Sequence, residues 1–512
     1  MTIYNLITRL KPNIQTHILL QNKTKISLLQ SKLSQFSLHS TTSSTNANPK
    51  SISLSKEEFL MSHLKKCSTM KDLKQLHSSV IQSGFEQNLF VIGKVIAFCA
   101  VSDHGDMNYA VSVFESVENP DGFLWNTMIR GFGKINESVI AFEYYKRMQE
   151  KKLVADNFTF SFLVKICGQM GSVWLGKQMH CCVLKHGFES HVFVRNSLIH
   201  MYGVFKEFVI ARQLFDEMPS PELVAWNSII GCCVDCGEFK EAIGLFSRML
   251  SCGVEPDEAT IVVVLAACSV LGELNFGRWV HSLVSNSSLG SLVEVSNSVI
   301  DMYAKCGAVE EAHETFNRMI ERNVITWNTM ILGLATHGHT NEALVLFSKM
   351  LEQHLFKPDG ITFLGILCAC SHGGMVDQGR RFFDVMSKEY QIQPTIKHYG
   401  CMVDILGRAG FVEEAYGLVR SMPMECNAII WRTLLAACKL HGNVEVGEKV
   451  RRHILEVEPD HSSDYVLVSS MYAGIGQWNQ VMVVRESMQK RGIHKPEPGN
   501  SFIGMQPNLL NL

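Results

Sequence analysis

Apolar residues recur at helical spacing along most of the chain, and they do so in pairs of stripes separated by a short break. Between residues 324 and 359 the first stripe falls at i, i+3, i+4 and i+7, and it consists of Trp327, Met330, Ile331 and Leu334. The polar stretch HGHTN follows, and then a second stripe of Ala343, Leu346, Phe347 and Met350. Proline in FKPD (356–359) ends that stripe. The pattern predicts two helices joined by a turn.

The same pattern returns after a fixed interval. A Trp-Asn pair occurs in LWNTMIRG, AWNSIIG and TWNTMILG, and the asparagines Asn126, Asn227 and Asn328 are 101 residues apart. Each interval divides into three different two-helix units of 35, 35 and 31 residues. The predicted units are 57–88, 89–121, 122–156, 157–191, 192–222, 223–257, 258–292, 293–323, 324–359, 360–395 and 396–427. The chain is therefore expected to be a tandem repeat array.

One segment conflicts locally with this reading. The stretch IVVVLAAC (261–268) has the composition of a buried strand, but its place in the repeat is helical in every sister unit. We therefore expect a helix there. One helical hairpin cannot bury its apolar face alone, so stacked hairpins are expected to form a solenoid with a concave face.

Composition limits the class of function. The chain is 46% hydrophobic and 19% charged, as expected for a folded protein, and no run of apolar residues is long enough to span a membrane. Before Glu57 there are seven Lys or Arg and no acidic residue. The remainder carries 40 basic and 49 acidic residues, a net charge of −9. Bulk attraction cannot explain nucleic-acid binding by such a body, so any binding must use a local surface.

The basic, Ser- and Thr-rich amino terminus is typical of an organelle transit peptide. We assign residues 1–55 to a transit peptide or disordered segment. MTIYNLITRL can form a short amphipathic helix, which favours the mitochondrion, whereas the scarcity of Arg leaves the chloroplast as the alternative.

Candidate metal and catalytic residues do not form recognisable sites in the sequence. Of sixteen cysteines, only Cys233 and Cys236 form a Cys-x-x-Cys pair, and no second pair stands at ligand spacing. Cys167, Cys268 and Cys370 recur with the repeat and are expected to be small buried residues. Neither a Walker-type loop nor His-Glu-x-x-His occurs. We therefore expect no metal, no cofactor and no catalytic residue.

Units of 31, 35 and 35–36 residues with WNxxI, MYAKCG and PDxxTF phrases resemble the pentatricopeptide repeat family of plant organelles, and their alternating lengths resemble its PLS subclass. The resemblance covers about residues 57–500. It implies an all-α fold, a right-handed superhelical solenoid of helix-turn-helix pentatricopeptide repeats.

The recurring Asn has two interpretations. Trp125, Trp226 and Trp327 lie on the apolar stripe and are expected in the core, but Asn is a poor residue for a helix interior. It can bond the backbone of the neighbouring repeat, or it can lie on the concave face and offer its amide to one base of single-stranded RNA.

The resemblance supports base reading, because in this family the fifth and last residues of a repeat together select the base. It implies uridine for Asn126/Asp156, Asn227/Asp257 and Asn328/Asp359, and a pyrimidine for Asn297/Asn323 and, more weakly, for Asn196/Glu222. Ser161/His191, Val262/Leu292 and Leu364/Thr395 carry no recognisable code, and the flanking repeats are equally poor. The implied RNA core is U-x-Y-U-x-Y-U.

The segment 428–503 resembles the E motifs, which are similar to tetratricopeptide repeats and follow such arrays in RNA editing factors; 504–512 is a tail. Relatives often continue into a DYW deaminase domain, whose His-x-Glu and Pro-Cys-x-x-Cys ligands do not occur here. We therefore expect a non-enzymatic, sequence-specific factor for C-to-U editing of single-stranded organelle RNA. Its expected partners are a deaminase-bearing DYW-type protein and multiple organellar RNA editing factors in trans. The alternatives are an adaptor for splicing, stabilisation or translation of RNA and, more remotely, a pure protein scaffold.

Overall fold

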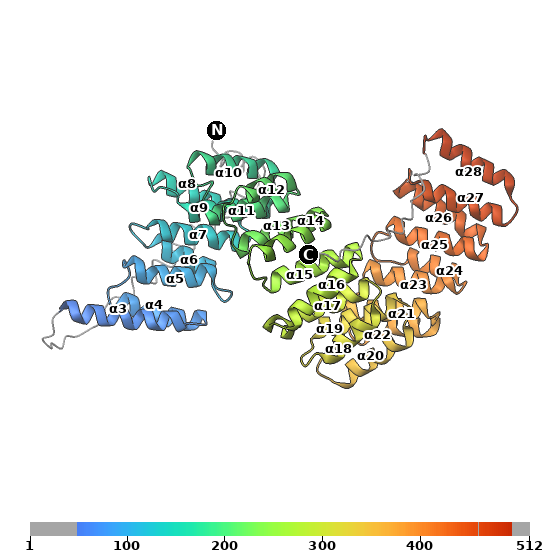
Figure 1. The fold of residues 1–512 in the computed structure, drawn as a ribbon, viewed down its shortest axis with the longest axis horizontal. Helices are drawn as coiled ribbons and strands as arrows, with labels where there is room; N and C mark the ends of the chain where they lie inside the picture. The colour runs from blue at the N-terminus through green and yellow to red at the C-terminus, as the bar shows by residue number, and fades with distance from the viewer. Residues whose placement is uncertain (1–48, 459, 494–512) are drawn as a thin grey trace. The chain divides into compact units, whose positions relative to one another are not determined.

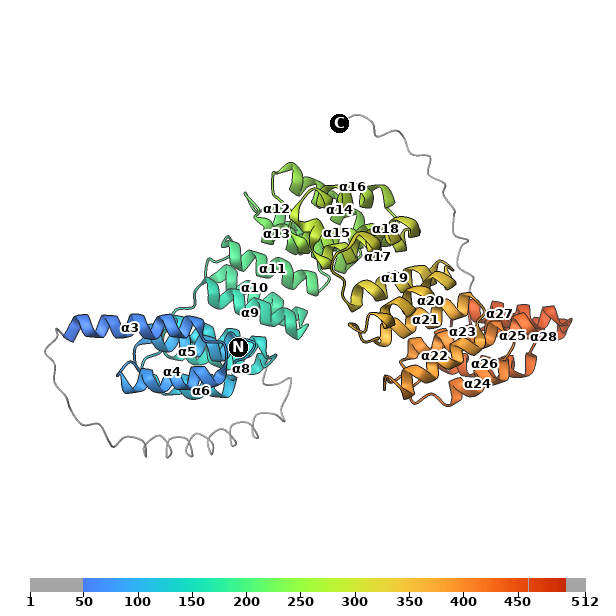
Figure 2. The same cartoon turned by 90° about the horizontal axis from the view of Figure 1, so that it is seen from below.

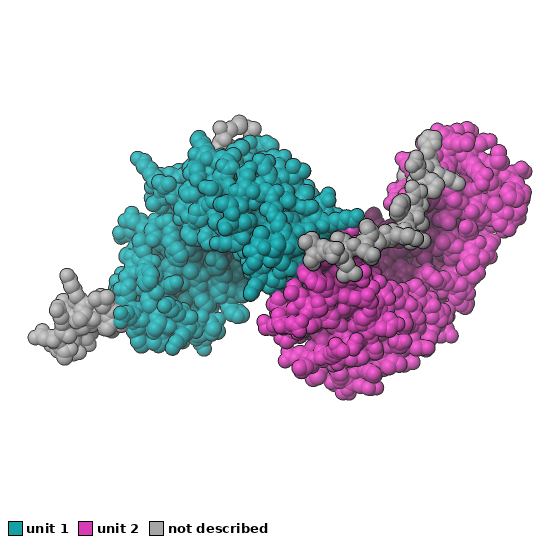
Figure 3. All heavy atoms as spheres, viewed as in Figure 1, with its two compact units in different colours: residues 1–267 teal, residues 268–512 magenta. Residues whose placement is uncertain are grey.

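The computed structural model describes residues 49–458 and 460–493, and these residues form helices, turns and no strand. The segment expected to be a transit peptide lies outside the described residues except for 49–55, which begin the first helix of the described part. Residues 459 and 494–503 of the predicted E-motif segment and the tail 504–512 lie outside them as well. The chain divides into two compact units, Met1–Ala267 and Cys268–Leu512 (Figure 3).

The described part of the first unit is a series of paired helices. They are α3 Pro49–Lys66, α4 Met70–Gln82, α5 Leu89–Val101, α6 Met107–Glu115, α7 Gly122–Lys134, α8 Ser138–Glu150, α9 Asn157–Met170, α10 Val173–Lys185, α11 Val192–Val204, α12 Phe208–Asp216, α13 Leu223–Cys236, α14 Phe239–Ser251 and α15 Glu258–Leu271, which runs across the division between the units. The first helices of successive hairpins, α5, α7, α9, α11 and α13, pack side by side (Figures 1 and 2).

The second unit continues the same pattern. Its helices are α16 Leu274–Ser285, the 3-10 turn η2 Ser288–Ser291, α17 Val293–Lys305, α18 Val309–Arg318, α19 Val324–Thr336, α20 Thr340–Glu352, α21 Gly360–His372, α22 Val376–Lys388, α23 Ile396–Arg408, α24 Val412–Arg420, α25 Ala428–His441, α26 Val444–Val457, α27 Ser462–Gly474 and α28 Trp478–Lys490. Here α17, α19, α21, α23, α25 and α27 form the layer of first helices. Each unit is thus a stack of helical hairpins, the arrangement of a solenoid.

A capping residue stands before several of the first helices. Asp156 and Asp359 accept hydrogen bonds from the backbone N–H of Thr159 and Thr362, and each threonine accepts one in return from the backbone N–H of its aspartate. This reciprocal capping box satisfies amide groups that the helix leaves unpaired. The segment 261–268 lies within α15, as predicted from the repeat rather than from its composition.

The tryptophans form the repeated centre of the core. Trp125, Trp226 and Trp327 are only 1–2% exposed. Each meets the edge of a phenylalanine from the second helix of the preceding hairpin, with ring centroids 4.8, 4.7 and 5.1 Å apart at Phe114, Phe215 and Phe316 respectively. Edge-to-face pairs of this kind add about 0.5–1.5 kcal/mol to the burial of the rings.

Glycines permit the close approach of neighbouring first helices. A Cβ added to Gly333 would lie 2.8 Å from the Cβ of Ala304, and one added to Gly407 would lie 2.8 Å from that of Ala437. Both distances are shorter than van der Waals contact, so a larger residue would push the hairpins apart.

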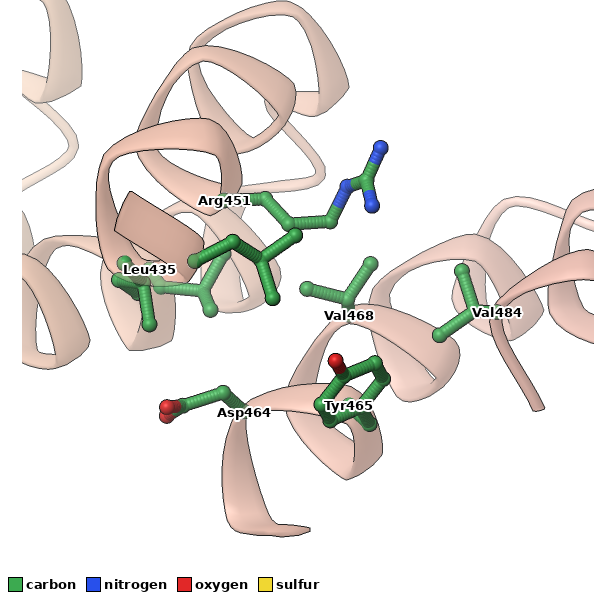
Figure 4. Close-up of a pocket in the computed structure, with 8 residues that line it drawn as sticks. Leu435, Arg451, Asp464, Tyr465, Val468 and Val484 are labelled. Carbon is green, nitrogen blue, oxygen red and sulfur yellow. The ribbon is translucent and has the colours of Figure 1, made fainter. Parts of the chain in front are cut away.

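The last two hairpins, α25–α28, are joined by a charged contact at their junction. Arg432 donates to Asp464 at 2.7 Å and to Glu458 at 2.5 Å, and the Asp464 side chain is only 4% exposed. Figure 4 shows Leu435, Tyr465, Val468 and Val484 around a small pocket between these helices, with the Asp464 carboxylate turned away from Val484. The ion pair supplies the partner that a buried carboxylate requires.

Three buried or half-buried histidines are expected to make the fold sensitive to acid. His180 and His281 each share a hydrogen bond with a tyrosine of the next repeat, Tyr202 at 2.9 Å and Tyr303 at 3.0 Å, and His398 contacts the Gly360 carbonyl at 2.7 Å. Burial lowers the pKa of all three imidazoles below the usual 6.5.

We expect the free energy of unfolding to fall as the pH drops from 6.5 towards about 5, because the unfolded chain then takes up protons that the folded chain resists. Urea unfolding at a series of pH values measures this slope. Substituting His281→Gln should make the slope shallower, whereas the same change at the exposed His104 should leave it unchanged. Equal slopes in the two variants would contradict the attribution of this pH dependence to His281.

Candidate nucleic-acid interface

Three of the predicted base-selecting pairs are joined directly by hydrogen bonds. Asn126, on α7, donates from Nδ2 to both carboxylate oxygens of Asp156, at 3.0 and 3.2 Å. Asn227, on α13, does the same to Asp257 at 3.0 and 3.1 Å, and Asn328, on α19, donates to Asp359 at 2.9 Å. In each case the aspartate is the N-cap of the first helix of the next repeat, so the pair connects two neighbouring hairpins.

A threonine completes each of these pairs. Thr159, Thr260 and Thr362 are 0–1% exposed and occupy the third place of the next repeat. Their hydroxyl oxygens lie 2.7, 2.5 and 2.6 Å from the Oδ1 of Asn126, Asn227 and Asn328 respectively. The buried amide oxygen therefore has a donor, as buried polar groups normally do.

The Asp257 carboxylate illustrates the electrostatics of the pair. Burial by itself raises its pKa, but the backbone N–H and hydroxyl of Thr260 and the Asn227 amide outweigh burial and hold the pKa below the usual 3.8. The group is therefore an anion and a pure hydrogen-bond acceptor at neutral pH.

The other predicted pairs are looser or absent. Asn297 Nδ2 lies 3.4 Å from Asn323 Oδ1, and no hydrogen bond joins Asn196 to the exposed Glu222 within the described residues. The buried Oδ1 atoms of Asn196 and Asn297 have no partner there. Ser161, from a repeat without a recognisable code, contacts Ser197 of the next repeat through its hydroxyl at 2.7 Å rather than His191.

These contacts bear on the two interpretations of the recurring Asn. A bond to the backbone of the neighbouring repeat was one of them, and it is wrong for the three paired asparagines: their partners in the next repeat are side chains. Asn126 and Asn328 are buried, with 4–5% of the residue exposed, and each amide bridges two repeats through side-chain hydrogen bonds. Base reading by these pairs stays a prediction.

A row of exposed apolar residues was not predicted from the sequence. They stand at the second place of several units, three residues before the fifth place, which is Asn in four of them, and therefore on the same side of the first turn. Their exposed fractions are Phe90 64%, Phe123 53%, Phe158 49%, Phe193 57% and Val224 58% in the first unit, and Ile325 62%, Ile361 54% and Ile429 67% in the second. The rings of Phe158 and Phe193 stack with centroids 6.0 Å apart.

Such residues are not needed for the core, and flat or branched apolar side chains offer surfaces on which nucleic-acid bases stack. The recurrence of an apolar residue at the second place could have revealed the row in the sequence. The exposure of these residues could not be predicted from the sequence, because apolar residues at neighbouring positions of the same helical turn are buried.

The cysteines take the small buried role predicted for the repeat. Cys167, Cys268 and Cys370 are 0% exposed, and burial raises their pKa values to about 12, 12 and 11. All sixteen thiols are free, and the described residues contain no group of three His, Cys, Asp or Glu side chains placed to hold a metal ion. Within the same residues, no helix has the length and apolarity to cross a membrane.

Sequence profiles of known families match the repeats and the carboxyl-terminal hairpins. The profile described as PPR repeat family matches residues 120–169, 221–269 and 322–372, and that described as PPR repeat matches 193–220, 294–324 and 397–426. The E motif profile matches residues 441–504. The first set contains the three Asn–Asp–Thr clusters.

Similar proteins cover nearly the whole chain. A pentatricopeptide repeat-containing protein of Arabidopsis thaliana, named as chloroplastic/mitochondrial, is 41% identical over 454 residues, which are 85% of this chain and 70% of the relative. A second such protein from Arabidopsis thaliana is 36% identical and covers 87% of this chain and 89% of its own length. The crystal structure of the pentatricopeptide repeat protein PPR10 from maize shares the fold at 14% identity, with a TM-score of 0.54 over 92% of this chain and 71% of that one. The chain therefore belongs to the pentatricopeptide repeat family and carries an E motif.

Proposed function

We propose that the chain binds single-stranded RNA along the first helices of the hairpins in each of its two units and selects bases with the Asn–Asp pairs. The observation that carries this proposal is the threefold recurrence of the same polar pair beside an exposed apolar residue, on the same turn of α7, α13 and α19. Apolar side chains can stack on a base while the pair reads its edge. Another member of the family, PPR10, has been crystallised with an 18-nt psaJ RNA element.

The chemistry of the pair favours uridine. Nδ2 of each asparagine uses one N–H for the aspartate, and its second N–H has no protein acceptor among the described residues. That N–H can donate to a uracil carbonyl, and the adjacent carboxylate can accept the uracil N3–H. Cytosine has no N3–H, so a carboxylate facing its unprotonated ring nitrogen is unfavourable.

The finer proposal is that the chain is a specificity factor for C-to-U editing. The match of residues 441–504 to the E motif supports it, because the resemblance associates that motif with editing factors. On this proposal the chain performs no chemistry itself. The deaminase comes from a DYW-type partner, together with multiple organellar RNA editing factors.

The proposed compartment is a plant organelle, with the mitochondrion ahead of the chloroplast. The basic amino terminus, whose sequence is predicted to form a short amphipathic helix, supports this choice, and a 41% identical relative is named as chloroplastic/mitochondrial.

Deep sequencing of mitochondrial and plastid transcripts from plants with and without this gene tests the function. We expect one or a few cytidines to lose editing. With repeat 396–427 about four nucleotides upstream of the edited base and one base per repeat, uridines are expected about 6, 9 and 12 nucleotides upstream. Unchanged editing with a retained intron or a lost transcript end would instead support an adaptor that acts by occupying RNA.

A further inference from the structure

Five repeats carry Asn at the fifth place, but the five amides are not held alike. In Asn126, Asn227 and Asn328 both ends of the amide have a protein partner, an aspartate at the nitrogen and a threonine at the oxygen. In Asn196 and Asn297 the buried oxygen has no partner within the described residues. The nitrogen of Asn297 makes only a long bond of 3.4 Å.

The difference lies in the contact made by the residue at the third place of the next repeat. After Asn196 that residue is Ala225, which has no hydroxyl. After Asn297 it is Thr326, whose hydroxyl lies 3.0 Å from Oδ1 of its own cap Asn323 and makes no hydrogen bond to Asn297. The hydroxyls of Thr159, Thr260 and Thr362 also lie near their own caps, at 2.8, 2.8 and 3.1 Å, but each is closer to the asparagine of the preceding repeat, at 2.7, 2.5 and 2.6 Å. The tight amide geometry therefore occurs where a threonine hydroxyl reaches back to the preceding repeat.

Simple hydrogen-bond chemistry then sets the orientation of the amide. A carboxylate only accepts hydrogen bonds, so the amide atom that faces aspartate must be the nitrogen. A hydroxyl that donates to the other end must face the oxygen. With both ends held, rotation of the amide breaks two hydrogen bonds, and the second N–H of the nitrogen stays in one direction. Where the amide oxygen has no partner, rotation of the amide breaks fewer hydrogen bonds.

We propose that Thr159, Thr260 and Thr362 are positioning residues for base selection, each fixing the amide of the preceding repeat so that it presents a donor to uridine. This inference rests on the proposed function of the Asn–Asp pairs. It makes the reading unit a set of three residues from two repeats. It also assigns weaker discrimination between uridine and cytidine to the repeats of Asn196 and Asn297.

The test is the ratio of dissociation constants for RNAs that differ by U or C at the nucleotide read by Asn328, measured with the full chain. That nucleotide is the one whose identity ceases to matter in Asn328→Ala. Substituting Thr362→Val should lower the preference for U about fivefold, because one hydrogen bond that holds the amide is lost. Substituting Thr362→Ser, which keeps the hydroxyl, should restore most of the preference.

Thr326→Val is the matched control. Thr326 is as buried as Thr362 and has the same capping contacts, with Asn323 in place of Asp359, but its hydroxyl makes no hydrogen bond to the asparagine of the preceding repeat. Thermal unfolding should change similarly in the two valine variants, and only Thr362→Val should change the U-to-C ratio at the nucleotide read by Asn328.

A second pair of variants tests the same inference by gain, and it does not depend on the folding of Thr362→Val. Glu222→Asp places an Asn–Asp pair at Asn196 without a threonine, and Glu222→Asp with Ala225→Thr adds the hydroxyl. We expect the double variant to prefer U over C about fivefold more strongly than the single variant at that nucleotide.

The outcomes separate the inference from the proposed function. An unmodified chain with no base preference at the nucleotide read by Asn328 would overturn base reading itself. A normal preference that is unchanged in Thr362→Val, or equal in the two Glu222→Asp variants, would overturn only the positioning role of threonine.

Discussion

Replacing Asn126, Asn227 and Asn328 together with alanine is expected to weaken binding to a single strand with uridine at the three matching positions by about a hundredfold. Each replacement removes one amide donor to a base, a contact worth about 1 kcal/mol, and three such losses give about 3 kcal/mol. Binding to a strand with adenine at those positions should change much less. Fluorescence anisotropy with labelled oligonucleotides measures both affinities at one stated salt concentration.

A control variant distinguishes base reading from a general loss of asparagine. Asn108, Asn317 and Asn341 are exposed and lie on α6, α18 and α20, the second helices of their hairpins. Their joint replacement by alanine should leave RNA affinity unchanged. If the two triple variants, both folded by circular dichroism, bound RNA equally well, the array would be better described as a protein scaffold.

The second large effect concerns stability. Trp226→Ala is expected to lower the free energy of unfolding by about 3–5 kcal/mol, the usual range for a buried tryptophan. The side chain is 1% exposed, meets Phe215 edge-on at 4.7 Å, and lies under the guanidinium of Arg248 at 5.6 Å. Because repeats contact mainly their neighbours, the hairpins on either side should lose stability first.

Equilibrium unfolding in urea, followed by hydrogen exchange of the helices, measures this effect and its location. Trp478→Ala is the matched control because Trp478 is 65% exposed, and its replacement should change stability by at most about 0.5 kcal/mol. Equal losses in the two variants would show that burial of the repeated tryptophan is not what holds the hairpins together.

Most of the fold could be predicted from the sequence because its causes are local. The start of α9 follows from Asp156 and Thr159, which form a capping box within four residues of chain. The helix over 261–268 could be predicted because sister repeats share one register, although its own composition favours a strand. The burial of Trp125 follows from its place on an apolar stripe.

The candidate site could be predicted only in part. The family resemblance pairs Asn126 with Asp156, and the structure brings them together. The resemblance also pairs Asn297 with Asn323, whose bond is long. The threonine that distinguishes these cases stands 33 residues along the chain from Asn126. A sequence pattern does not show whether its hydroxyl turns to the asparagine of the preceding repeat or to its own cap.

By itself, then, the sequence determined the repeat, its helices, its core and the residues that stand at the fifth and last places, because periodicity and capping act over a few residues. Only the tertiary structure decided which amides are held at both ends and that the row from Phe90 to Val224 is exposed. Those properties depend on how one hairpin packs against the next. Differences of a few tenths of an ångström in the distance between side chains that are far apart in the chain decide whether a hydrogen bond forms.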